Sequence, residues 1–121
     1  MKILVADDEP DVRQALQVLF RKHGHEVILA SHGDGALALV FAERPDVVFL
    51  DDNMPGKNGL DVCVELRTHP PYQPLPIYIV TGLDRSVYAD HAGASCATAC
   101  LTKPLKSRSL LNLLARTAES L

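Results

Sequence analysis

Four short apolar runs in this chain each end at a polar residue, and this repetition limits what the chain can fold into. Residues 2–6, 47–50, 77–80 and 99–102 lead into Asp7, Asp51, Thr81 and Lys103. Each run has the length and the β-branched or aromatic content of a buried strand. In an open parallel sheet, side chains beyond the carboxyl ends of the strands meet at one edge. The pattern therefore predicts one cleft that holds acids, a hydroxyl group and a lysine.

Helical patterns separate these runs. Apolar residues at helical spacing predict a helix that begins near Pro10 and ends before Gly24, and residues 26–30 have the pattern of another strand. Residues 84–95 are expected to form a helix with less regular spacing. Three polar residues are expected to cap the remaining helices: Asp34, Asn58 and Ser107. The alternation predicts an α/β fold, a doubly wound five-stranded parallel sheet with helices on both faces.

Length and composition narrow the class of protein. With 121 residues, of which 47% are hydrophobic, the chain is expected to be one domain spanning residues 1–121. A net charge of −3 provides no basic surface for nucleic acid or an anionic membrane. No apolar run approaches the ~20 residues of a membrane span, and no signal peptide is evident. Three cysteines favour a reducing compartment, so we expect a cytoplasmic protein.

The motifs at the strand ends resemble those of a known family, the receiver domains of two-component response regulators. The resemblance covers essentially the whole chain. It rests on the pair Asp7-Asp8, the segment Leu50-Asp51-x-x-Met54-Pro55-Gly56-x-x-Gly59, Thr81-Gly82 and Lys103-Pro104. Separations of 43, 30 and 22 residues between Asp8, Asp51, Thr81 and Lys103 are also typical of that family. It implies a flavodoxin-like three-layer sandwich, similar to the chemotaxis regulators, with strand order 2-1-3-4-5.

The chemistry of the clustered acids agrees with this resemblance. Three carboxylates in one cleft repel one another unless a cation joins them, and Mg²⁺ prefers oxygen ligands. The resemblance implies that Mg²⁺ is bound directly by Asp8, Asp51 and the backbone carbonyl of Asn53, with Asp7 acting through water. A carboxylate is also a possible covalent nucleophile toward phosphorus. The resemblance makes Asp51 the phosphoacceptor.

The same resemblance implies the partners of the reaction. Lys103 would supply positive charge and Thr81 a hydrogen bond during phosphoryl transfer. The donor would be a phosphohistidine on a sensor histidine kinase or a histidine phosphotransfer protein, and a downstream effector protein or domain would respond. The chain would then be a regulator rather than an enzyme, with self-dephosphorylation expected. The Lys103-Pro104 peptide is expected to be cis.

Other interpretations fit parts of the pattern. Isolated acids after strands often serve only as turn or capping residues. A phosphorylation-independent interaction module could retain the cleft as a remnant of the same fold. A Mg²⁺-dependent phosphatase would usually have a second acid two residues after its nucleophile, where this chain has Asn53. The complete set of Asp8, Asp51, Thr81 and Lys103 favours the phosphorylated switch.

Cysteine replaces a residue that is usually aromatic in the family. Three positions before the lysine, receivers commonly have Tyr or Phe, and this chain has Cys100. We therefore expect phosphorylation to have a weaker effect on the surface around residues 86–102. Cys96 and Cys100, with His91 nearby, match no strong zinc pattern, so buried structural thiols are favoured over a metal or redox site.

Overall fold

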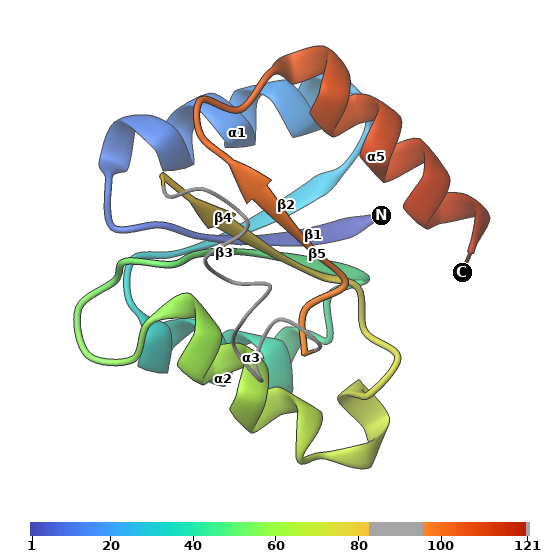
Figure 1. Cartoon of the computed structure of the whole chain (residues 1–121). Helices are drawn as coiled ribbons and strands as arrows, with labels where there is room; N and C mark the ends of the chain where they lie inside the picture. The colour runs from blue at the N-terminus through green and yellow to red at the C-terminus, as the bar shows by residue number, and fades with distance from the viewer. Residues whose placement is uncertain (83–95, 121) are drawn as a thin grey trace.

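The computed structural model describes residues 1–82 and 96–120, which form a three-layer α/β sandwich (Figure 1). The strands of its central sheet are β1 (Lys2–Ala6), β2 (Glu26–Ala30), β3 (Val47–Asp51), β4 (Ile77–Thr81) and β5 (Ala99–Thr102). All are paired in parallel, in the order β2-β1-β3-β4-β5. The predicted fold class and strand order are confirmed.

Helices cover both faces of the sheet, as Figure 1 shows. On one face lie α1 (Pro10–Lys22) and α5 (Ser107–Glu119), and on the other lie α2 (Gly33–Glu43) and α3 (Gly59–Arg67). A short 3-10 helix, η1 (Pro70–Tyr72), follows α3. The helix expected at residues 84–95 lies outside the described residues.

The strands in the middle of the sheet are apolar along almost their whole length because both of their faces are covered. Every residue of β3 and β4 is buried. Under α1 and α5, the core contains Phe20 and Phe49, whose stacked rings have centroids 5.5 Å apart. Under α2 and α3, it contains aliphatic residues such as Leu50 and Leu66. These two cores hold the helices against both faces of the sheet, and the polar residues lie at its carboxyl edge.

Asn58 caps α3, as the sequence predicts. Its side chain accepts a 2.8 Å hydrogen bond from the Asp61 backbone N–H, and the Asp61 carboxylate accepts one from the Asn58 backbone N–H at 3.2 Å. This reciprocal capping box satisfies two backbone donors that the helix itself leaves unpaired. It fixes where α3 begins, and therefore the length of the loop that follows β3.

Two predicted caps are wrong. His32, rather than Asp34, caps α2, because its Nδ1 atom accepts a 3.0 Å hydrogen bond from the Gly35 backbone N–H. The helix consequently begins at residue 33, and Asp34 lies inside its first turn. At α5 the position before the first helical residue is Lys106, which makes no side-chain capping bond, and Ser107 is already helical.

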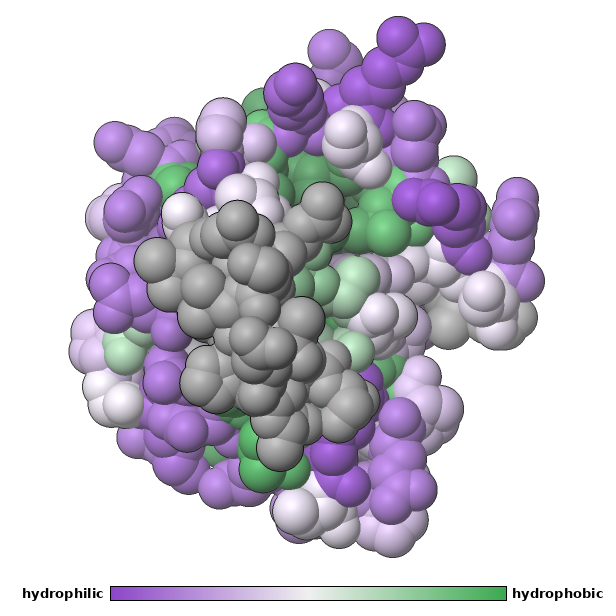
Figure 2. All heavy atoms as spheres, viewed as in Figure 1, coloured by the Kyte–Doolittle hydropathy of each residue, from purple (hydrophilic) through white to green (hydrophobic). Residues whose placement is uncertain are grey.

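The surface seen in Figure 2 is largely hydrophilic, with hydrophobic residues visible beneath α5 and next to β5. A recess of ≈ 320 Å³ lies between these two elements, and its apolar lining includes Leu101, Leu105, Leu110 and Leu113. Over the part of the chain that is described, no helix is long and apolar enough to cross a membrane.

Candidate functional site

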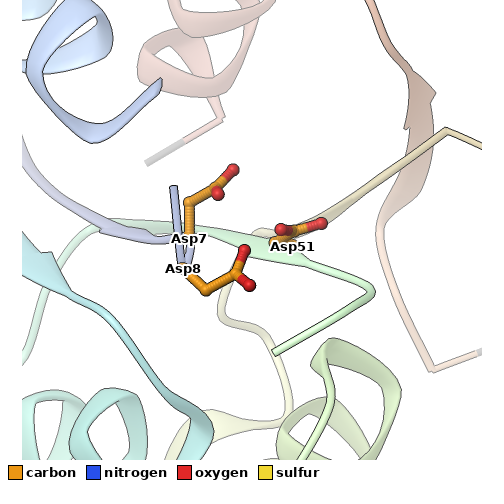
Figure 3. Close-up of side chains that lie close together, drawn as sticks. All are labelled: Asp7, Asp8 and Asp51. Carbon is orange, nitrogen blue, oxygen red and sulfur yellow. The ribbon is translucent and has the colours of Figure 1, made fainter. Parts of the chain in front are cut away.

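Three carboxylates meet at the carboxyl edge of the sheet because β1 and β3 are neighbours. Their register pairs Ala6 with Leu50, so the residues that follow reach the same edge. One oxygen from each of Asp7, Asp8 and Asp51 lies within 4.8 Å of the others, and Figure 3 shows the three side chains grouped together. Asp7 and Asp51 are only 3% and 4% exposed, whereas Asp8 is exposed. The predicted acidic cluster is therefore present.

Lys103, in the loop after β5, faces two of these acids. Its Nζ atom lies 3.5 Å from Asp7 Oδ2 and 3.5 Å from Asp51 Oδ1. Burial by itself would lower the pKa of Lys103, but the carboxylates of Asp7 and Asp51 outweigh burial and raise that pKa. Lys103 is therefore a charged ammonium group at neutral pH. The Lys103-Pro104 peptide bond is cis, as predicted.

The surroundings of Asp51 favour the protonated form of its carboxyl group. Burial, and then the neighbouring carboxylate of Asp7, raise its pKa from 3.8 to about 7. The Lys103 ammonium and the Asn53 backbone N–H, which lies 3.4 Å from Asp51 Oδ1, act in the opposite direction without cancelling this rise. The ionised form of Asp51 is thus disfavoured, and an added cation among the three carboxylates would favour it. The contact from the Asn53 N–H also places the backbone of Asn53 next to the carboxylate of Asp51.

Thr81 is brought to the same edge but bonds to a different acid. It is fully buried at the end of β4, and its Oγ1 donates a 2.6 Å hydrogen bond to Asp52 Oδ2. The register pairs Asp51 with Val80, which places the next residues, Asp52 and Thr81, at the same level. Sequence reasoning assigned no role to Asp52. The sequence pattern that could have predicted this contact is an acid directly after Asp51 and a hydroxyl residue at the end of the next strand, β4.

Glycines allow the loop after β3 to turn back against the strand. Gly56 has φ of +75°, a backbone conformation that favours glycine. At Gly59, a Cβ atom would collide with the Asp51 carbonyl oxygen. Any larger residue there would push the first turn of α3 away from the end of β3. Both glycines therefore help to position the backbone around Asp51.

Lys57 fastens the same loop to the two helices beneath it. Its Nζ atom lies 2.9 Å from Glu65 Oε1 in α3 and 3.6 Å from Asp34 Oδ1 in α2. The carboxylate of Asp34 therefore forms an ion pair with the loop after β3, rather than acting as the predicted cap of α2. This network restrains the loop that contains Asn53.

Of the cysteines, only Cys63 is fully buried. Cys96 and Cys100 are partly exposed, so the expectation that they are buried is wrong. Burial first, and then the neighbouring Cys96 thiol, raise the pKa of Cys63 well above its ordinary value. Cys100 lies in β5, as the sequence predicts. His91 lies outside the described residues.

This combination of fold and site defines a class of signalling protein. Residues 3–115 match the family described as the response regulator receiver domain. The match covers most of the chain, and the chain therefore belongs to the family of response regulator receiver domains. The resemblance inferred from the strand-end motifs is confirmed.

Similar proteins are known from several bacteria. Protein PilH of Pseudomonas aeruginosa is 36% identical over 110 residues, which are 91% of this chain and 91% of PilH. The chemotaxis protein CheY4 of Vibrio cholerae is 32% identical with a TM-score of 0.87, covering 96% of this chain and 97% of that one. The response regulator TrrA of Thermotoga maritima, solved in complex with Mg²⁺-BeF, is 30% identical with a TM-score of 0.85 and the same coverage.

Proposed function

We propose that this receiver domain, spanning residues 1–121, is a signalling switch that accepts a phosphoryl group on Asp51 in a Mg²⁺-dependent reaction. The observation that carries the proposal is the convergence of Asp7, Asp8 and Asp51, with the Lys103 ammonium 3.5 Å from two of them. Only Asp51 of the three stands at the end of β3, between β1 and β4 in the sheet. Asp51 is therefore the acid that has neighbouring strand ends on both sides.

The donor groups fit Mg²⁺. Three carboxylates whose oxygens lie within 4.8 Å form a set of hard oxygen donors, and one nearby ammonium leaves their charge incompletely neutralised. We assign Asp8, Asp51 and the backbone carbonyl of Asn53 as direct ligands, with Asp7 acting through water. When bound, Mg²⁺ supplies positive charge that favours the ionised carboxylates and the phosphoryl oxygens.

The remaining steps belong to the side chains of this protein. An ionised Asp51 oxygen attacks the phosphorus of a phosphohistidine, the P–N bond breaks, and its electron pair leaves on the imidazole nitrogen. The product is an acyl phosphate on Asp51. Lys103 places its ammonium beside the new charge, and the Thr81 hydroxyl donates a hydrogen bond to it. Attack of water on the phosphorus then breaks the P–O bond to Asp51, which releases inorganic phosphate and returns the carboxylate. This step is the expected self-dephosphorylation.

The phosphoryl donor is a sensor histidine kinase or a histidine phosphotransfer protein, and a downstream effector protein or domain responds to the phosphorylated form. With such partners, we propose that the protein acts in the cytoplasm. Similarity to PilH and to a chemotaxis protein supports a regulatory role rather than turnover of a separate substrate.

Incubation with acetyl phosphate tests this function, because small acyl phosphates carry the same transferable group as a phosphohistidine. In the presence of Mg²⁺, intact mass should rise by about 80 Da, the mass of one HPO₃ group. Chelation of Mg²⁺ with EDTA and the variant Asp51→Asn should each abolish the adduct. Asp11→Asn, which removes an exposed acid of α1, is the matched control and should retain it.

Two results would contradict the proposal. An adduct of the same size in Asp51→Asn would show that another residue is the acceptor. A folded wild-type protein that binds Mg²⁺ but forms no adduct would instead favour the phosphorylation-independent interaction module.

A further inference from the structure

The hydrogen bond between Thr81 and Asp52 ties a residue of the site to an acid that the proposed reaction does not use. Thr81 Oγ1 lies 2.6 Å from Asp52 Oδ2, and Thr81 is fully buried. A hydroxyl group has a single proton to donate. While Thr81 donates to Asp52, that proton is not available to an oxygen of a phosphoryl group on Asp51.

Backbone hydrogen bonds hold both residues in place. The Asp52 N–H donates to the Val80 carbonyl at 2.9 Å, which continues the pairing of β3 with β4 beyond Asp51. The Lys103 N–H donates to the Thr81 carbonyl at 2.8 Å from the opposite side. Because the two backbones are fixed in register, exchange of the hydrogen bond requires rotation of side chains rather than movement of strands.

The Asp52 carboxylate belongs to the residue that directly follows Asp51, and its bond to Thr81 keeps it at the same edge of the sheet. A phosphoryl group on Asp51 adds negative charge, about −1.5 to −2, beside this carboxylate. Asp52 would therefore oppose the phosphorylated state in two ways, by retaining the Thr81 hydroxyl and by like-charge repulsion.

We propose that Asp52 is a positioning residue that holds the Thr81 hydroxyl away from Asp51 in the unphosphorylated protein. Phosphorylation then requires Thr81 to exchange its Asp52 acceptor for a phosphoryl oxygen. The inference rests on the proposed phosphoacceptor function and adds a residue of this chain that biases the switch toward its unphosphorylated state. Hydrogen bonds to carboxylates are stronger than neutral ones, so the bias is measurable.

Binding of beryllofluoride with Mg²⁺, measured by calorimetry, tests this exchange because beryllofluoride mimics a phosphoryl group on Asp51. Removal of the competing acceptor in Asp52→Ala should tighten binding by about three- to tenfold, the size of one net hydrogen bond. Asp52→Asn keeps an acceptor oxygen but loses the charge, so its gain should be smaller. The control Asp11→Ala removes an exposed acid of α1 and should change little.

A double-mutant comparison separates the hydrogen bond from simple charge repulsion. In a Thr81→Ala background there is no hydroxyl to release, so Asp52→Ala should lose most of its gain. Charge repulsion alone would give equal gains for Asp52→Ala and Asp52→Asn, and both would persist without Thr81. As a second measurement, the Thr81 methyl resonance of ligand-free Asp52→Ala should move toward its position in the beryllofluoride-bound wild type.

The outcomes of the binding experiment separate the role of Asp52 from the phosphoacceptor function of Asp51. If the wild type binds beryllofluoride but Asp52→Ala binds no more tightly than Asp11→Ala, Asp52 does not hold Thr81. An unreduced gain in the Thr81→Ala background would overturn the inference in the same way. Failure of the folded wild type to bind beryllofluoride at all would overturn the phosphoacceptor function itself, and the role of Asp52 with it.

Discussion

Single residues set the charge balance at the carboxyl edge of the sheet. Asp7 and Asp51 are almost completely buried and share one ammonium, that of Lys103, at 3.5 Å from each. The net result is a pKa of about 7 for Asp51. An acid with this pKa is a poor nucleophile while it is protonated, so a cation that favours its ionised form also prepares it to react.

The pH dependence of Mg²⁺ binding follows from this pKa. Mg²⁺ and a proton compete for Asp51, so affinity should fall as pH decreases through about 7. From about pH 8 to about pH 6, the Kd for Mg²⁺ should rise about tenfold, because each pH unit below the pKa costs a factor of ten. Titrations in Asp51→Asn should show little of this pH dependence. A flat profile for the wild type would contradict a raised pKa at Asp51.

Neutralisation of Asp51 should stabilise the protein when Mg²⁺ is absent. The pKa of Asp51 is higher in the folded protein than its ordinary 3.8, so stabilisation by its protonated form is complete below pH 3.8 and lost as pH rises through about 7. At about pH 8 in EDTA, Asp51→Asn should therefore raise the free energy of unfolding by about 1–3 kcal/mol, measured with urea. Saturating Mg²⁺ should reduce this difference in the free energy of unfolding between Asp51→Asn and the wild type. Lower stability of the variant in EDTA would mean that attraction to Lys103 dominates.

Removal of Asp8 should weaken Mg²⁺ binding with little cost to the fold. Asp8 is exposed, and we assign it as a direct ligand. In Asp8→Ala, the Kd for Mg²⁺ should rise at least about tenfold, while the urea midpoint in EDTA should change little, as for other exposed positions. Unchanged Mg²⁺ affinity in this variant would remove Asp8 from the ligand set.

At the scale of elements, strand register and loop anchoring place these residues. β1 and β3 pair in parallel so that Asp7, Asp8 and Asp51 leave the sheet together. The loop from β3 to α3 is held by the Asn58 capping box and by Lys57, which contacts both α2 and α3. The site is thus built from strand ends and from a loop held by hydrogen bonds and ion pairs. Movement of its side chains would require some of these contacts to break.

Gly59 should be intolerant of a side chain because of its position between two elements. A Cβ atom in Gly59→Ala would collide with the Asp51 carbonyl oxygen, so β3 or α3 must shift. We expect a loss of about 1–3 kcal/mol of stability together with weaker Mg²⁺ binding. Gly82→Ala is the control for stability, because its added Cβ meets no atom of the described residues within 4 Å. Equal stability of the two variants would show that the contact at Gly59 is easily relieved.

Cys100 should weaken the transmission of phosphorylation to β5. This strand carries a small thiol where the family commonly has an aromatic ring, so a ring that could rotate is missing at this position. Amide exchange with and without beryllofluoride should show strong protection in the loop after Asp51 and only a weak change across residues 86–102. Protection of that segment equal to the Asp51 loop would contradict this prediction.

At the scale of the whole molecule, the sheet and the acidic cluster could be predicted because they follow from repeated local patterns. Each apolar run ends in a polar residue, and parallel strands bring those ends to one edge. The α2 cap could not be predicted, since Asp is among the residues that most often cap helices and His is not, yet His32 makes the capping bond. The bond from Thr81 to Asp52 depends on side-chain rotamers, which no sequence pattern specifies.

The most direct test of the phosphorylated switch is to locate the acyl phosphate chemically. Borohydride reduces an aspartyl phosphate to homoserine, so labelled borohydride marks the residue that held the phosphoryl group. After reaction with acetyl phosphate and Mg²⁺, peptide mapping should place the label at residue 51 of the wild type, with none in EDTA or in Asp51→Asn. Label at another acid of the wild type, or equal label in Asp51→Asn, would contradict Asp51 as the phosphoacceptor.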